Sequence, residues 1–325
     1  MGNYKVVKYS SLYYEEWNAF VLNAKNATFL FHRDFMEYHQ DRFEDFSLMV
    51  FKNDHLIAVL PANKLDNRLF SHQGLTYGGF VVGKKLKFQD FIKSFKVLLE
   101  TLDDYGFLTL EIKVIPYIYT ELPSDDINCL MFILEAKLIQ TNILSVVDLG
   151  KQIKFTKSRI EGCNRGKKNN LEIREVDSLK EFWDDILIPN LKSKYKTDPV
   201  HSLTEITLLK NRFPENIRQF NVYHDDDIVA GVTIFETKKV AHAQYISANS
   251  YKNTLGSLDF LHEYLIKKKF KNKAYFDFGT SNENQGRNIN KGLLFWKEGF
   301  GAKVITQNFY RINVNGYNKL NHIML

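Results

Sequence analysis

The feature that most constrains the fold is an internal repeat. The stretch LMVFKNDHLIAVLPA at 48–62 resembles FNVYHDDDIVAGVTI at 220–234, about 170 residues further along the chain. Each consists of an apolar alternation, a polar four-residue turn and a second alternation that passes through an alanine, a pattern that predicts a β-hairpin. Two hairpins at this spacing predict two copies of one fold.

The similarity continues beyond the hairpins. In each copy a third strand-like segment, an amphipathic segment of helical period and a final strand-like segment follow in the same order. These segments are 70–79, 88–102 and 107–114 in the first copy, and 240–249, 257–270 and 274–281 in the second. The sequence therefore predicts an α/β fold (α+β, with mixed sheets) in two tandem domains, over residues 1–150 and 151–325.

Charge and cysteine usage restrict the partners and the compartment. The formal net charge is +6, which favours anionic partners such as nucleotide sugars, coenzyme A, tRNA or anionic lipids without choosing among them. Cys129 and Cys163 lie far apart and outside any CxxC pattern, as is usual in a reducing compartment. The N-terminus has no apolar leader region, and no run of apolar residues is long enough to span a membrane. We therefore expect a cytoplasmic protein. The apolar block at 129–134 has the size of a buried strand.

Metal chemistry is not expected. The acidic run from His224 to Asp227 occupies the place that Lys52 to His55 occupy in the first copy, so it is interpreted as a hairpin turn rather than a metal cluster. His262 and Glu263 begin like a zinc-protease motif, but Ile266 stands where the second histidine is needed. No other histidines or cysteines have ligand spacing, so the sequence predicts neither a structural nor a catalytic metal.

The joint between the copies is basic. Residues 151–170 place Lys154, Lys157, Arg165 and Lys168 along a predicted amphipathic helix, with a capping box at Ser158 to Glu161 and two glycines that weaken it. One interpretation is a solvated connector. The other is a phosphate-binding helix.

A glycine-rich stretch, GLTYGGFVVG at 74–83, permits two interpretations. It lies ahead of a predicted helix, where a phosphate-binding loop would lie, but its glycines match neither GxGxxG nor a P-loop. Apolar residues between the glycines favour a bulged strand end instead. Because a bulge changes the direction of side chains, Tyr77 is a candidate substrate contact.

The segment 275–302 carries a family resemblance. A strand ending in FDFG, a polar loop and the pattern G-x-x-x-[FW]-K-x-x-F-G, from Gly292 to Gly301, resemble the C-terminal signature of the FemABX peptidyltransferase-like family. Its members consist of tandem GNAT-type acyltransferase domains. FLFHRDFMEYHQDRF at 29–43 and SHQGLTYGG at 71–79 agree with the first domain, and 158–176 resembles the basic first helix of the second.

The resemblance implies two tandem GNAT-like (acyl-CoA N-acyltransferase) domains, with residues after about Asn313 packing back on the first. It implies transfer of an acyl or aminoacyl group from a thioester or ester, acyl-CoA or aminoacyl-tRNA, to a primary amine held between the copies. The acceptor would be a cell-envelope precursor or a nucleotide-linked amino sugar, with phosphate groups. GNAT enzymes hold the coenzyme A pyrophosphate in a Q/RxxGxG/A loop. SYKNTLGS at 250–257 offers only Gly256, which puts coenzyme A in doubt.

Some site residues follow from the resemblance. The lysine of the family signature falls on Lys297, and the basic residue of the first domain that contacts the acceptor falls near Arg42, with Arg33 and His39 as alternatives. These positions are therefore expected to bind substrate or to act in the transfer.

Acyl transfer to an amine needs a neutral amine and a site for the developing oxyanion. The strand at 240–249 provides a backbone N–H for that site if it separates from its neighbour, as the corresponding GNAT strand does. The catalytic candidates are Lys297, to stabilise negative charge, Asp277, to accept a proton or orient the amine, and Tyr245. The substrate-binding candidates are Arg33, His39, Arg42, Tyr77, Gln244, Ser247, Asn284 and Arg287.

Each candidate also has an ordinary explanation. Tyr245 suits a core aromatic, Asp277 a cap of the turn at 279–284, and Lys297 a surface lysine that extends to solvent. The polar loop that contains Asn284 and Arg287 suits either a lid over an anionic ligand or a disordered connection. At the level of function, the alternative to an enzyme is a non-catalytic tandem-GNAT module that binds nucleotide sugar or RNA. The acyl group, the acceptor and the oligomeric state stay open.

Overall fold

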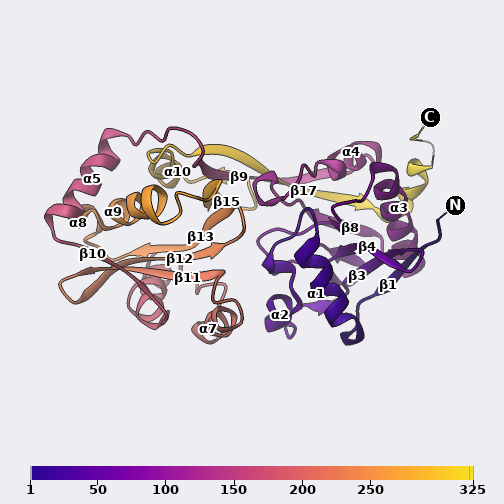
Figure 1. Cartoon of the computed structure of the whole chain (residues 1–325), viewed down its shortest axis with the longest axis horizontal. Coiled ribbons are helices and arrows are strands. Elements are labelled where there is room, and N and C mark those ends of the chain that lie inside the picture. The colour runs from indigo at the N-terminus through magenta and orange to yellow at the C-terminus, as the bar shows by residue number, and fades with distance from the viewer. Residues whose placement is uncertain (1, 322, 325) are drawn as a thin grey trace. The chain divides into compact units, whose positions relative to one another are not determined.

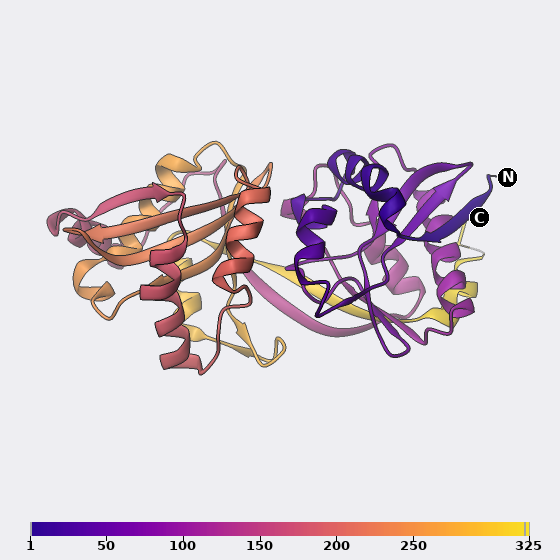
Figure 2. The same ribbon diagram turned by 90° about the horizontal axis from the view of Figure 1, so that it is seen from below.

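The computed structural model describes residues 2–321 and 323–324, and these separate into two compact units (Figure 1). Unit 2 comprises residues 143–305, and unit 1 comprises the described residues before and after it. The chain enters unit 2 within β9 (Lys137–Asp148) and returns to unit 1 within β17 (Lys303–Asn313), as Figure 2 shows. The division thus falls inside a strand at 142/143, whereas the sequence analysis placed the boundary at residue 150.

Unit 1 contains two sheets. The first is antiparallel, in the order β1-β3-β4-β7. The second has the order β9-β17-β8-β6-β5-β2 in this unit, with β6 and β8 parallel. The strands are β1 (Tyr4–Lys8), β2 (Glu44–Asp45), β3 (Leu48–Lys52), β4 (His55–Leu60), β5 (Asn63–Leu65), β6 (Arg68–Phe70), β7 (Val81–Val82) and β8 (Thr109–Lys113).

Helix α3 (Phe88–Asp104) holds the core of unit 1 together. Its buried residues recur at helical spacing and pack in one cluster with residues of both sheets, such as Val50 and Leu110. The 3₁₀ segment η7 (Val314–Leu320) packs on α3, so the end of the chain completes this core. The other helices of the unit are α1 (Tyr14–Asn23), α2 (Arg33–Met36) and α4 (Asp126–Ile133).

Unit 2 is built on a mixed sheet of order β10-β11-β12-β13-β14, with the end of β9 antiparallel to β14. Alternate residues of β12 face opposite sides: Val232 joins the core cluster that contains Leu261 of α9, whereas Gly231 faces Phe182 of η5. In Figure 1, α5, α8, α9 and α10 lie on one side of the sheet and α7 lies on the other.

The elements of unit 2 are β10 (Glu172–Val176), β11 (Ile217–His224), β12 (Asp227–Glu236), β13 (Val240–Ala248), β14 (Tyr275–Thr280), β15 (Asn282–Glu283) and β16 (Asn288–Ile289). The helices are α5 (Lys157–Lys168), α6 (Ile188–Tyr195), α7 (Leu203–Arg212), α8 (Lys252–Leu255), α9 (Ser257–Tyr264) and α10 (Lys291–Glu298), with π-helical segments η5 (Phe182–Leu187) and η6 (Leu265–Lys269).

Both predicted hairpins are confirmed. β3 pairs with β4, and β11 pairs with β12, both antiparallel. Each hairpin carries a register shift at the same place in the repeat, between Val50 and Phe51 in unit 1 and between Val222 and Tyr223 in unit 2. A shared bulge at equivalent positions is a structural mark of the repeat that was not visible in the sequence pattern.

The predicted strand at 70–79 is wrong. β6 ends at Phe70, and the chain then turns before the short strand β7. The turn is bound to the end of β8: Ser71 Oγ accepts from the Lys113 N–H at 2.8 Å, and the Gly78 N–H donates to the Lys113 carbonyl at 3.0 Å. His72 has a left-handed φ of 64°, which no regular strand allows. The repeat is therefore not exact at its third strand.

The apolar block at 129–134 is also different from the prediction, because it lies in α4 and its end rather than in a strand. Leu130 and Met131 are buried on one side of the helix, whereas Phe132 is exposed. A run of six apolar residues is too short for its period to distinguish a helix from a strand.

Helix α5 begins later than predicted and packs closely. Its N-cap is Thr156, and Ser158 and Glu161 form no capping box. The two glycines, which suggested a weak helix, face α9: a Cβ on Gly162 would lie 1.8 Å from Asp259 Oδ2, and one on Gly166 would lie 2.5 Å from the Phe260 Cβ. Small residues at this spacing allow two helices to approach each other.

We expect Gly162→Ala to lower the free energy of unfolding by about 2 kcal/mol, because the added methyl group overlaps the Asp259 carboxylate and forces α5 away from α9. Gly292→Ala in α10 is the matched control, since its Cβ would meet only Asn290 Oδ1 at 3.7 Å and alanine favours a helix. Urea titrations of both variants check the difference. Equal stability of the two would contradict the close packing of α5 on α9.

Candidate functional site

The strands β13 and β14 form a fork in unit 2. Their parallel pairing joins only Val240 to Tyr275, Ala241 to Phe276 and His242 to Asp277. Beyond this last pair β13 continues to Ala248 without pairing to β14. This is the separation on which the oxyanion role of the strand at 240–249 depends, and it places His242 and Asp277 at the base of the fork.

A bulge in β13 lies next to the fork. Tyr245 pairs with Thr233 and Ala243 pairs with Ile234, so Gln244 has no opposite residue on β12. Gln244 Oε1 is buried and accepts no hydrogen bond from any described residue. Bulges are common beside active sites because they release backbone groups from the sheet, so Gln244 keeps its candidate role.

Asp277 is buried at the base of the fork, and each of its carboxylate oxygens has a partner. Its Oδ1 accepts from the Gly279 N–H at 2.7 Å, and its Oδ2 lies 2.9 Å from His242 Nδ1. The first contact is the turn-capping role that was considered for Asp277. The second contact was not predicted, because finding His242 requires the parallel register of β13 and β14, which sequence alone does not provide.

Lys297 lies in the same cluster. Its side chain is inside the protein, with only 2% of the residue exposed, so the alternative of a lysine extending to solvent is wrong. Nζ donates to the carbonyls of Gly279, at 3.1 Å, and Thr280, at 2.6 Å. Burial lowers the pKa of Lys297 to about 8, while the nearby charge of Asp277 acts in the opposite direction.

The aromatic run around Lys297 is only partly packed. Trp296 and Phe300 pack around His262 of α9, whose complete burial lowers its pKa to about 4. Phe295, in contrast, is 65% exposed on the other side of α10. The structure therefore brings Lys297 and Asp277 together through Gly279, with His262 on the apolar side of the lysine.

Tyr245 and Ser247 bind other partners. The Tyr245 hydroxyl lies 2.5 Å from His201 Nδ1 and accepts from the His201 N–H at 3.2 Å, and burial raises its pKa. Ser247 Oγ accepts from Asn190 Nδ2 at 2.8 Å. These contacts attach α6, through Asn190, and the segment around His201 to strand β13. The catalytic role of Tyr245 stays a prediction.

The polar loop forms an ordered hairpin, β15–β16. Asn284 has a left-handed φ of 48° in the turn. Its side-chain amide Nδ2 donates to Asn288 Oδ1 at 2.8 Å. Asn282 Oδ1 ties the base of the hairpin to β9 by accepting from the Ile143 N–H at 2.7 Å. Asn284 and Arg287 are exposed, so they can contact a ligand, and their predicted role stays open.

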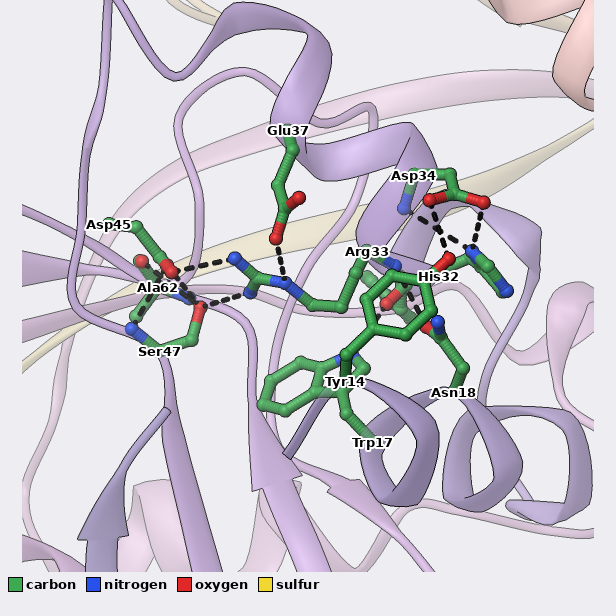
Figure 3. Close-up of polar contacts among 11 residues, drawn as sticks. Tyr14, Trp17, Asn18, His32, Arg33, Asp34, Glu37, Asp45, Ser47 and Ala62 are labelled. Atoms are coloured by element: carbon green, nitrogen blue, oxygen red, sulfur yellow. Dashed lines mark hydrogen bonds and ion pairs between the residues drawn. The ribbon is translucent and has the colours of Figure 1, made fainter. Parts of the chain in front are cut away.

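In unit 1, Arg33 is the centre of a buried polar network (Figure 3). Its guanidinium binds Glu37 at 2.9 Å, Asp45 at 2.7 Å and Ser47 at 3.2 Å, and it stacks 3.7 Å from the centre of the Tyr9 ring. The side chain is 3% exposed. Arg33 starts the short helix α2, and each of its three guanidinium nitrogens donates to one of these side chains.

Arg33 forms part of the wall of a cavity of about 380 Å³ within unit 1. Lys8 adds a second cation, and Glu37 and Asp45 add carboxylates. The full lining is Lys8, Tyr9, Ser10, Ser11, Arg33, Met36, Glu37, Gln40, Phe43, Asp45 and His72. A cavity of this size, with a few polar side chains that converge on it, is typical of small-molecule sites.

His72 is the most constrained residue of this wall. It is 3% exposed and its Nδ1 has no hydrogen-bond partner among the described residues. Its ring stacks 5.0 Å from that of His39. Burial, reinforced by the nearby His39, Arg33 and Lys113, holds the pKa of His72 well below its ordinary value. Burial likewise lowers the pKa of Lys113 to about 8. An anion bound here would favour the charged forms of Arg33 and Lys113, which disfavour protonation of His72.

The remaining predicted contacts lie outside this cavity. Arg42 is exposed, with its guanidinium 5.6 Å from the centre of the Tyr38 ring. Tyr77 is buried, and its hydroxyl donates to Thr28 Oγ1 at 2.9 Å. Of the three alternatives for the basic residue of the first domain, Arg33 lines the cavity and His39 stacks behind it. His72 was missed because the sequence assigned it to a strand.

The described part of the chain holds neither a metal-ligand cluster nor a membrane-spanning helix. No group of three or more histidine, cysteine, aspartate or glutamate side chains there could hold a metal ion. No helix within residues 2–321 has the length and apolar character to cross a bilayer.

Comparison with known proteins identifies the fold. No family model matches the sequence, and no curated protein is detectably similar to it. FemX superposes with a TM-score of 0.67 at 12% identity, covering 98% of this chain and 99% of that chain. The chain has the tandem GNAT-like fold of FemX. The fold prediction is thereby confirmed, as is the resemblance that led to it.

Two other structures of this fold are similar. The C-terminal domain of a putative lysylphosphatidylglycerol synthetase from Agrobacterium fabrum has a TM-score of 0.54 at 14% identity, over 81% of this chain and 84% of that chain. A tandem GNAT protein from the clavulanic acid biosynthesis pathway has a TM-score of 0.52 at 9% identity, over 96% and 99%. At these identities the likeness concerns the fold, and the site residues must be argued from their own geometry.

Proposed function

We propose that the protein is an N-acyltransferase that moves an acyl or aminoacyl group from an activated ester or thioester to a primary amine. The observation that carries the proposal is the fork in unit 2, where paired strands separate directly after Asp277 and the buried Lys297 lies beside it. A separated strand offers backbone N–H groups to an oxyanion, and a cation of lowered pKa nearby can stabilise the same charge. The fold of FemX and of a tandem GNAT protein supports this reaction class.

For the donor, we favour an aminoacyl ester over coenzyme A. The first turn of α9, where GNAT enzymes bind pyrophosphate, is covered by α5. A Cβ on Gly256 would lie 2.1 Å from the Gly162 carbonyl, and Arg165 Nε donates to the Asn253 carbonyl at 3.0 Å. A donor that reached this turn would have to displace α5. The basic residues of α5 and the net charge of +6 suit an RNA-linked ester such as aminoacyl-tRNA.

For the acceptor, we propose an amine with a phosphate or other anionic group, such as a cell-envelope precursor or a nucleotide-linked amino sugar. The anion would bind in the cavity of unit 1, beside Lys8, Arg33 and His72. Glu37 and Asp45 neutralise much of the charge of Arg33, so Lys8 would supply the remaining positive charge and the neutral His72 ring a hydrogen bond to the anion.

The reaction is tested by incubating the full chain and UDP-glucosamine with either acetyl-coenzyme A or a pool of charged tRNA. Free thiol reports the first donor, and labelled amino acid on the acceptor reports the second. Transfer from tRNA without thiol release is the expected result. Tight, strongly salt-dependent RNA binding without any transfer would favour the non-catalytic module instead.

The acceptor site predicts a loss of binding in His72→Asn. Asparagine tolerates the left-handed backbone of residue 72 but removes the imidazole. We expect the Kd for UDP-glucosamine, measured by calorimetry, to rise at least about tenfold, which is the value of one charge-assisted hydrogen bond. Arg42→Gln is the control and should bind as the wild type does. Equal weakening in the two variants would argue against the cavity as the acceptor site.

A further inference from the structure

We propose that His242 is the general base of the transfer reaction and that Asp277 is its positioning residue. This inference rests on the proposed function, and it names the group that makes the acceptor amine nucleophilic. The contact between His242 Nδ1 and Asp277 Oδ2, at 2.9 Å, carries it. Both residues occupy the last pairing position of β13 and β14, so two backbones fix their relation.

The contact determines the tautomer of the imidazole. An ionised carboxylate can only accept hydrogen bonds, so Nδ1 of His242 must carry a hydrogen towards Asp277. The lone pair of the neutral ring is then on Nε2, the atom that can accept a proton from an amine. The other oxygen of Asp277 accepts from the Gly279 N–H at 2.7 Å. Two contacts therefore hold the carboxylate in place, and the carboxylate holds the ring.

The position at the fork suits a base. His242 is largely buried, with 8% of the residue exposed, and Asp277 is enclosed at 1%. The Cε1 edge of the ring lies over Gly279, where a Cβ would come within 3.2 Å. The carbonyl of Gly279 in turn accepts from Lys297 Nζ. Gly279 thus lies next to the proposed base His242, donates to the carboxylate of Asp277 and accepts from the ammonium of Lys297.

The step balances with the groups present. The neutral acceptor amine attacks the carbonyl carbon of the donor, and His242 Nε2 takes one proton from the nitrogen as the C–N bond forms. Lys297 stabilises the negative charge on the carbonyl oxygen. The C–O or C–S bond of the donor then breaks, its electron pair leaves with the oxygen or sulfur, and the imidazolium returns the proton to that atom.

His242→Gln tests the role in the full chain, with the donor that proves active and UDP-glucosamine. We expect kcat to fall about a hundredfold with little change in KM, which is the low end of general-base effects. His224→Gln, at the end of β11 next to the hairpin turn, is the matched control and should leave kcat unchanged.

A second measurement separates this inference from the proposed function. Long-range ¹H–¹⁵N spectra of the full chain report which ring nitrogen of each histidine carries the hydrogen. We expect the Nδ1–H form for His242, lost in Asp277→Asn. An active enzyme whose His242→Gln variant retains kcat would overturn the inference alone, and so would an Nε2–H form of His242. A wild type without any transfer activity would overturn the proposed function, and the base role with it.

Discussion

In Lys297→Met we expect kcat/KM to fall by about a hundredfold or more, since the loss of one group that stabilises transition-state charge typically costs about 3 kcal/mol. Methionine keeps the bulk of the aliphatic stem in α10 and removes the ammonium. The measurement is the steady-state rate with the active donor and UDP-glucosamine. Activity within threefold of wild type would assign Lys297 a purely structural role.

The stability of this variant should change little, because two large effects oppose each other. The Gly279 and Thr280 carbonyls lose their donor, which costs about 1–3 kcal/mol per buried group. At the same time the protein no longer buries an ammonium whose pKa falls from 10.5 to about 8, a cost of about 3 kcal/mol. A buried group that costs stability is typical of functional sites.

The pH dependence has a definite sign. Between about pH 8 and 10.5 the unfolded chain binds the Lys297 proton and the folded chain does not. The unfolding free energy of the wild type should therefore rise with pH through this window, and the contribution from Lys297 should be absent in Lys297→Met. Lys113, which has a similarly lowered pKa, contributes equally to both proteins, so the difference between the two curves isolates Lys297. A catalytic ammonium also predicts that kcat/KM falls above about pH 8.

Part of this site could be predicted from the sequence because its signals are local. The alternation of 220–234 predicts a hairpin, and the resemblance of the pattern from Gly292 to Gly301 to a family signature pointed to Lys297, which the structure finds in contact with Gly279 next to Asp277. Both patterns depend on neighbours along the chain, where residue type and period determine the conformation.

The parts that could not be predicted depend on contacts between distant segments. His242 lies opposite Asp277 only because β13 and β14 are parallel and pair in a register whose last pair is these two residues. His72 lies in a cavity wall because the end of β8 binds the segment after β6 through Ser71 and Gly78. In both cases a hydrogen bond between distant segments determines where the side chain lies. The periodicity of the sequence does not predict such a bond.

Arg33→Met should cause a large loss of stability. Arg33 holds Glu37 and Asp45 on opposite edges of its guanidinium and covers the Tyr9 ring. Removing one member of a buried ionic network leaves its partners uncompensated, at a cost of about 3–5 kcal/mol. The carboxylates retain roughly a third of their exposure, with side-chain values of 37% and 31%. They can therefore recover some hydration, and we expect about 3 kcal/mol, from urea titrations at pH 7.

Arg311→Met is the matched control. In the same unit, Arg311 pairs at 2.8 Å with Glu111, whose side chain is 15% exposed, but the side chain of Arg311 is itself 40% exposed, so we expect a loss of only about 1 kcal/mol. Arg33→Lys should fall between wild type and Arg33→Met, because an ammonium keeps the charge but cannot bind Glu37, Asp45 and Ser47 in one plane. If Arg33→Met and Arg311→Met lose the same stability, the network of Figure 3 does not organise this wall, and the anion site beside His72 loses its support.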